Sequence, residues 1–76
     1  MAVMIGYILI RTATGKESEV IDSLSAFKNI REKHKIYGEW DIIAKAEFSK
    51  LPELNTLVLD IRSIIGVSQT STLVVF

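Results

Sequence analysis

The sequence predicts an α+β domain in which a four-stranded antiparallel sheet carries both of its helices on one face. Segments typical of strands and helices follow one another as strand, helix, strand, strand, helix, strand. This order folds as two βαβ halves joined by a turn. With 76 residues, 49% of them apolar, and no cysteine, the chain has room for a single domain, residues 1–76, without a disulfide.

The first half begins with a strand over Val3–Thr12 (VMIGYILIRT), whose two alternating faces are both apolar. This pattern predicts a central strand that is covered on both sides. Thr14 and Glu17 fit a capping box, so a helix is predicted to begin there. Its apolar stripe recurs at helical spacing and consists of Val20, Ile21, Leu24 and Phe27.

The middle of the chain predicts a hairpin. Ile30–Tyr37 is rich in charged residues, as is typical of a solvated edge strand. Gly38 marks the turn, and Asp41–Phe48 forms the second arm with apolar residues at alternate positions.

The second helix is predicted to begin at Ser49 as N-cap, with Pro52 in its first turn. Gly66 ends it, and Val67–Phe76 forms the last strand. The apolar stripe of this helix consists of Leu54, Leu57, Val58, Ile61 and Ile65.

Two apolar sets alternate on the first strand, and two helices on one side can cover only one set. The sets are Val3, Ile5, Tyr7 and Leu9, and Met4, Gly6, Ile8 and Ile10. An apolar sheet face exposed to water would aggregate, so we expect it to meet another subunit. Because so small a domain is only marginally stable alone, we expect a homo-oligomer larger than a dimer.

The charge balance and the absence of special segments exclude several classes of partner. Nine basic residues balance nine acidic ones, so no long-range attraction to nucleic acid is expected. The start lacks a basic leader region, and no apolar run approaches the roughly 18 residues of a membrane span. We therefore expect a cytoplasmic protein with no membrane partner and no direct nucleic-acid partner.

Catalytic and metal chemistry have few candidate residues. His34 is the only histidine, and it lies among charged residues of an edge strand. It is expected to be a solvated side chain, with a pH-sensitive or ligand contact as the alternative. Metal-ligand spacing and phosphate-binding glycine motifs are missing, so no metal and no cofactor are expected. Glu39 and Asp41 lack the built-in separation of a general acid and base.

The candidate binding site is the turn Tyr37-Gly38-Glu39-Trp40-Asp41, which carries two carboxylates and the only tryptophan. Such a turn suits a small polar ligand or a partner chain. The alternative is a purely structural turn, in which Asp41 bonds the backbone. The hydroxyls of Thr70, Ser71 and Thr72 form a second polar cluster that can form hydrogen bonds with an ammonium or a carboxylate. The alternative is that threonine occurs here only because it favours strands.

These residues carry a family resemblance that spans nearly the whole chain. Gly38–Ala44 (GEWDIIA) resembles the G-x-[aromatic]-D-[apolar]3 signature of the Lrp/AsnC ligand-binding domain, also called RAM for regulation of amino-acid metabolism. Leu54-Asn55 and Ile64–Val75 resemble its second helix and its GV-x-x-T-x-T final strand. Gly15-Lys16-Glu17 resembles the start of its first helix.

The resemblance implies a ferredoxin-like αβ sandwich that dimerises through its sheets, with dimers joining into rings. Effector amino acids would bind between dimers around the turn, which assigns ligand contacts to Tyr37, Gly38, Glu39, Trp40, Asp41, Thr70, Ser71 and Thr72. No segment for a helix-turn-helix precedes the first strand, so we expect a stand-alone sensing domain that modulates full-length regulators. The alternatives are a small dimeric α/β-barrel enzyme and a purely structural assembly module.

Overall fold

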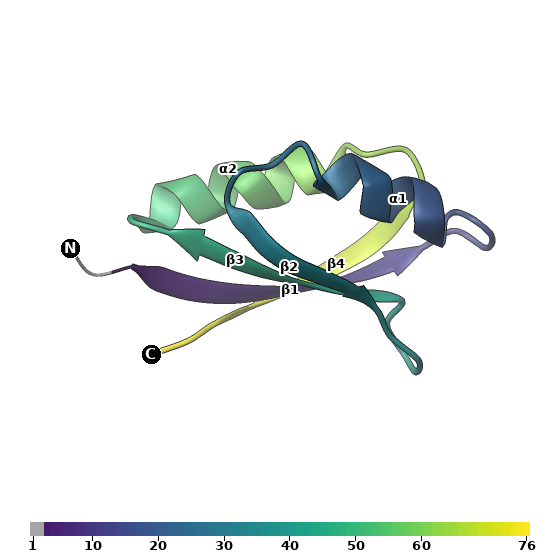
Figure 1. Cartoon of the computed structure of the whole chain (residues 1–76), viewed down its shortest axis with the longest axis horizontal. Coiled ribbons are helices and arrows are strands. Elements are labelled where there is room, and N and C mark those ends of the chain that lie inside the picture. The colour runs from purple at the N-terminus through teal and green to yellow at the C-terminus, as the bar shows by residue number, and fades with distance from the viewer. Residues whose placement is uncertain (1–2) are drawn as a thin grey trace.

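The computed structural model describes residues 3–76, so the first two residues of the predicted domain lie outside the described part. All six predicted elements are present. The four strands form one antiparallel sheet in the order β2-β3-β1-β4. Figure 1 shows both helices on the same side of this sheet, which confirms the predicted fold class. The elements are β1 (Met4–Thr12), α1 (Glu17–Leu24), β2 (Ile30–Lys35), β3 (Ile42–Phe48), α2 (Leu51–Arg62) and β4 (Val67–Val74).

The core lies between the helices and the sheet. In β1 and β3 alternate residues are buried, because side chains of a strand point to opposite faces in turn. The helices contribute the apolar residues that recur at helical spacing. The buried apolar residues are Ile8, Ile10, Val20, Leu24, Ile42, Ala44, Ala46, Phe48, Leu54, Leu57 and Ile61.

The strand order confirms that β1 is central and that β2 is an edge strand. It also leaves one face of the sheet without a helix (Figure 1). Since Leu9 pairs with Ile43 on one side and Ser71 on the other, the odd-numbered residues of these three strands share that face. Its apolar members, which we call the open sheet face, are Ile5, Tyr7, Leu9, Ile43 and Leu73.

Both predicted N-caps lie one or two residues before the observed ones. The N-cap of α1 is Lys16, without a side-chain cap bond, and not Thr14. Lys16 N–H donates to Ala13 O (3.0 Å) in a local turn, and Ala13 N–H donates to Gly66 O (2.8 Å) in a distant segment. The segment before α1 is therefore tied to the connection between α2 and β4. The N-cap of α2 is likewise Lys50 and not Ser49.

Ile65 is not part of the apolar stripe of α2, contrary to the prediction, and is 86% exposed. The helix ends at Arg62, and tight turns follow: Ile64 N–H donates to Ile61 O (3.0 Å) and Val67 N–H donates to Ile64 O (3.1 Å). Once the helix unwinds, its spacing no longer applies, and Ile64 packs against the core instead.

Two of the predicted strands end two residues earlier than expected. β2 ends at Lys35, which leaves Tyr37 fully exposed, and β4 ends at Val74, which leaves Phe76 fully exposed. Within residues 3–76, neither helix combines the length and the hydrophobicity that crossing a bilayer requires.

Candidate functional site

The predicted site residues 37–41 lie in the turn between β2 and β3. Figure 1 shows this turn projecting from one end of the sheet on the side away from the helices. Ile36 N–H donates to Asp41 O (2.9 Å) and closes the turn at its base. Gly38 has a φ of 137°, which favours glycine, and a Cβ there would meet nothing within 4 Å. The backbone at Gly38 is therefore open to an approaching molecule.

Asp41 fixes the turn to the end of the central strand. Its Oδ2 accepts hydrogen bonds from the backbone N–H of Thr12 (2.8 Å) and from Thr12 Oγ1 (3.3 Å). Asp41 N–H donates in turn to Ile10 O (2.9 Å). Because Thr12 is buried, this carboxylate satisfies a donor that has little access to water. One oxygen of Asp41 thus has a structural partner.

Arg11, on the open-face side of β1, organises the outer part of the turn. Its Nε and Nη2 both donate to the carbonyl oxygen of Glu39, at 3.0 and 2.8 Å. The guanidinium carbon lies 4.9 Å from the ring centroid of Trp40, within the range of a cation–π interaction. Nη1 donates to Gln69 Oε1 at 2.9 Å. All three guanidinium nitrogens therefore have a protein acceptor, and the positive charge stays beside the turn.

Sequence reasoning missed Arg11 and Gln69 as parts of the site. One signal was available: Arg11 is the only charged residue in β1, and it occupies the alternating position that continues an otherwise apolar face. A lone cation at the end of such a face indicates a specific partner. The sequence alone did not show which residue is that partner, because this depends on how the strands pair.

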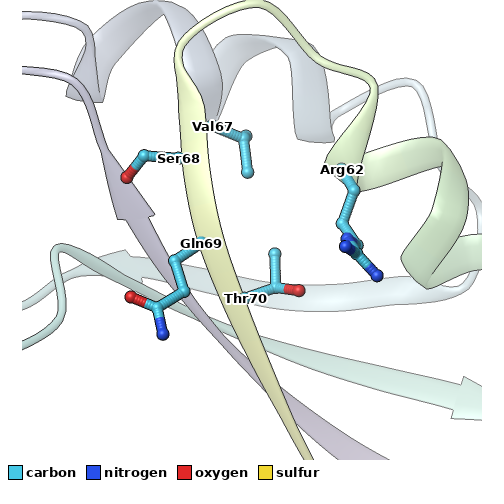
Figure 2. A pocket seen from close by; sticks show the side chains of 5 residues that line it. All are labelled: Arg62, Val67, Ser68, Gln69 and Thr70. Atoms are coloured by element: carbon cyan, nitrogen blue, oxygen red, sulfur yellow. The ribbon is translucent and has the colours of Figure 1, made fainter.

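The hydroxyl cluster of β4 is divided between the two faces of the sheet. Thr70 pairs with Ile10 and Thr72 with Ile8, so both lie on the helix side, whereas Ser71 pairs with Leu9 on the open face. Figure 2 shows Thr70 and Val67 on the same side of β4 as Arg62, with Ser68 and Gln69 on the other side of the strand.

Two hollows of about 330 Å³ each lie along α2 and β4, and Arg62 lines both of them. We call them together the α2–β4 groove. The first is lined mainly by polar residues, the second equally by apolar and polar ones, and Arg62 is the only charged residue among them. The lining residues are Arg62, Val67, Ser68, Gln69 and Thr70 in the first, and Leu54, Asn55, Val58, Leu59, Arg62 and Thr72 in the second.

The fold does not bring the turn and the two threonine hydroxyls into one pocket of a single chain. β1 lies between β3 and β4 in the sheet. The turn projects away from the helices, whereas Thr70 and Thr72 face α2. Arg11 connects the turn only to Gln69, on the opposite side of β4 from Thr70.

Other titratable residues of the described part lie along the β2 edge, next to β3. His34 Nε2 lies 3.5 Å from Glu32 Oε1 on the exposed β2 edge, and Nζ of the partly covered Lys45 on neighbouring β3 lies 3.5 Å from Glu32 Oε2. Within the part of the chain that the structure describes, no group of three or more His, Asp or Glu residues comes together as metal ligands. The arrangement offers hydrogen bonds and charge for recognition.

Comparison with known proteins identifies the family. Residues 5–76 match the family model of the Lrp/AsnC ligand binding domain. The chain belongs to this family. The HTH-type transcriptional regulator FL11 of Pyrococcus abyssi is 35% identical over 72 residues, which cover 95% of this chain and 48% of that protein. This Lrp/AsnC domain therefore spans about half the length of the curated relatives that it matches first.

Solved structures agree with the family. The crystal structure of hypothetical protein PHS023 from Pyrococcus horikoshii is 36% identical, with a TM-score of 0.88, and the match covers 99% of this chain and 90% of that one. The transcriptional regulator NMB0573 from Neisseria meningitidis, solved as an L-Met complex, shares the fold at 18% identity with a TM-score of 0.85, over 96% of this chain and 49% of its own. The family model and the FL11 regulator, and not these structures, show that the family consists of transcriptional regulators and not of enzymes.

Proposed function

We propose that this Lrp/AsnC domain senses an amino acid or a related small metabolite at its β2–β3 turn and assembles through its open sheet face. The observation that carries the proposal is the way in which Arg11 and Asp41 hold the turn from β1. The fixed turn presents the open backbone of Gly38, the exposed side chains of Tyr37 and Glu39, and the half-buried ring of Trp40.

These groups suit the chemistry of an α-amino acid. The ammonium of the ligand would pair with the carboxylate of Glu39 and with Asp41, whose Oδ2 is already bonded to Thr12. Its carboxylate would meet backbone N–H groups near Gly38 or hydroxyls of β4. The aromatic rings of the turn would cover its side chain. The L-Met complex of the Neisseria regulator supports an amino acid as the class of ligand.

Assembly through the open sheet face follows from its exposure. Leu73 is 54% exposed, and Ile5, Tyr7, Leu9 and Ile43 are only partly covered within one chain. Burying such a face against a second copy stabilises both copies by roughly 25 cal/mol per Å² of apolar surface. We extend the proposal to rings of such dimers, as the family resemblance implies. Full-length relatives contain the same domain, so we extend the proposal to mixed assemblies with such regulators.

A thermal-shift panel of the proteinogenic amino acids tests the sensing proposal. A ligand at about 100 times its Kd stabilises the folded state by about 2.7 kcal/mol. For a domain of this size that corresponds to a rise in Tm of roughly 10–20 °C. One amino acid, or a chemically related group, should produce such a rise. No detectable rise with any amino acid, in protein that is folded and assembled, would contradict the proposal.

A further inference from the structure

The two edges of the sheet differ in their charge. β2 forms one edge, and five of its six residues, 31–35, are charged or titratable. Such charges on an edge strand hinder pairing with a further strand. β4 forms the other edge, and its eight residues, VSQTSTLV, include no charged residue, no proline and no glycine. The sheet therefore has one protected edge and one edge that can accept a further strand.

The pairing with β1 determines which backbone groups of β4 point outward. Val75 N–H donates to Ile5 O (2.8 Å), and the register before it is regular except for a shift near the start of β4. In an antiparallel ladder the backbone groups of successive residues point to opposite sides, so every second residue before Val75 also bonds to β1. The residues between them, Thr70, Thr72 and Val74, direct their N–H and C=O groups away from β1. We call these three residues the β4 edge.

The β4 edge runs along the α2–β4 groove. Thr70 lines the first hollow of the groove and Thr72 the second. A strand added at this edge would keep the alternation of the sheet, so every second side chain of it would face the helix side. The residue opposite Thr72 would meet the apolar Val58 and Leu59, and the residue opposite Thr70 would meet Arg62, which lies on the same side of β4 (Figure 2). Unpaired edge groups beside pockets for alternate side chains are what strand addition requires.

Arg62 determines the charge of the strand that fits. It is exposed and is the only charged residue of the groove. The ion pairs within residues 3–76 join other residues, so a carboxylate opposite Thr70 would be a partner for the fork of donors of its guanidinium. A second copy of β4 contains no acid and would bring another arginine to the same place. The edge therefore suits a different, acid-bearing segment better than a copy of itself.

We propose that the β4 edge binds an extended segment of a partner protein by strand addition, antiparallel to β4. This direction continues the pattern of the sheet and is slightly more stable per residue than parallel pairing. It places the residue opposite Thr72 two positions before the residue opposite Thr70. The segment thus carries an apolar residue and, two positions later, Asp or Glu, within an uncharged stretch rich in β-branched residues. The interaction uses neither the turn nor an amino-acid ligand, so it does not depend on the sensing proposal.

Amide hydrogen exchange with a synthetic peptide tests the strand addition. The probe consists of threonine and valine, with one leucine and a glutamate two positions after it. When the protein is saturated with this peptide, the amides of Thr70, Thr72 and Val74 should exchange about tenfold more slowly or less, whereas Ser71, which already bonds to β1, should change little. Absence of binding, or binding without protection of the three edge amides, would overturn the proposal. Protection of these amides in the free protein would also overturn it, because another copy would then occupy the edge.

Thr72→Pro tests the edge itself. Proline removes one outward N–H and is tolerated on an edge strand, because no bond to β1 is lost. The affinity for the peptide should fall about tenfold or more. The matched control is Lys33→Pro on β2: Ile36 N–H donates to Asp41 O, so the alternation turns the backbone of Lys33 outward at the protected edge. Lys33→Pro should bind like the wild type. Equal affinities of Thr72→Pro and wild type would contradict the proposal.

Arg62→Gln tests the recognition of the acid, and it leaves the strand backbone unchanged. The wild type should bind the glutamate peptide about tenfold or more tightly than a peptide with glutamine at that position. Arg62→Gln should bind the two peptides equally. Lys28→Gln, an equal loss of charge at an exposed residue between α1 and β2, should keep the preference of the wild type. If Arg62→Gln keeps that preference as well, Arg62 does not read the acid and the proposed partner chemistry is wrong.

Discussion

At the scale of single residues, Arg11 determines the shape of the candidate site. Its planar guanidinium donates twice to Glu39 O and once to Gln69 Oε1 while lying against Trp40. A lysine ammonium carries the same charge, but it lacks the flat face and the fixed fork of donors that these contacts use. The turn therefore depends on this side chain for its geometry and not only for its charge.

Arg11→Lys should lower the free energy of unfolding by about 1–2 kcal/mol, through lost hydrogen bonds and lost stacking. Urea unfolding followed by the fluorescence of Trp40 measures the change, and the emission of the folded state should also shift as the ring loses its cover. Arg62→Lys is the matched control, because Arg62 joins none of the ion pairs within residues 3–76. Equal losses in both variants would show that Arg11 contributes only as a positive charge.

Asp41→Ala should lower the free energy of unfolding more than Thr12→Val does. The substitution leaves the backbone N–H of buried Thr12 without its acceptor, at a cost of about 1–3 kcal/mol. Thr12→Val removes only the longer bond from Oγ1 (3.3 Å) and should cost about 1 kcal/mol or less. Thermal unfolding of both variants measures the difference. If Thr12→Val is the more damaging change, the carboxylate does not anchor the turn.

At the scale of elements, the sequence predicted the strands and helices correctly but did not predict where each of them begins and ends. The two apolar sets of Val3–Thr12 and the charges of β2 identified a central and an edge strand, because burial on one or both faces imposes these patterns directly. The start of α1 was missed because the segment before it makes a tertiary contact. Ala13 N–H bonds to Gly66 O, and this distant contact decides where α1 begins.

Gly66 shows how closely these connections pack. Its φ is 103°, and an added Cβ would lie 3.1 Å from Lys16 Cβ and 3.2 Å from Val20 Cγ2 at the start of α1. Gly66→Ala should therefore be destabilising by about 2 kcal/mol or more, from the strained backbone and the crowding together. Gly38→Ala, which is strained but meets nothing within 4 Å, should cost about 1 kcal/mol. Equal shifts in Tm would mean that α1 moves aside freely.

At the scale of the whole molecule, the site depends on register, which is why sequence reasoning found only part of it. The turn was visible as a local cluster, but Arg11 lies 28 residues from Glu39 and 58 from Gln69. Only the pairing of β1 with β3 and β4 brings these residues together. The hydroxyls of β4 were likewise predicted as one cluster, and strand alternation divides them between two faces.

The open sheet face leads to a prediction about assembly. Leu73→Lys places a charge on this face and should weaken dimers about a hundredfold or more, because an unpaired charge would be buried. Leu59→Lys is the matched control: Leu59 is 63% exposed and Leu73 54%, but Leu59 lies on the helix side. Sedimentation velocity should show monomers of the first variant and intact dimers of the second. If both variants form dimers, the dimer interface does not include the open sheet face.

Binding of an amino acid at the turn is the central claim, and calorimetry on wild type and Glu39→Gln tests it most directly. The side chain of Glu39 is exposed and its carbonyl, not its carboxylate, binds Arg11, so the substitution leaves the turn in place. Glu53→Gln, on α2, is the control. With the amino acid that gives the largest thermal shift, Glu39→Gln should bind ten- to a hundredfold more weakly than wild type. Equal Kd values for wild type and Glu39→Gln, with the assembly intact, would contradict the account and place the ligand elsewhere.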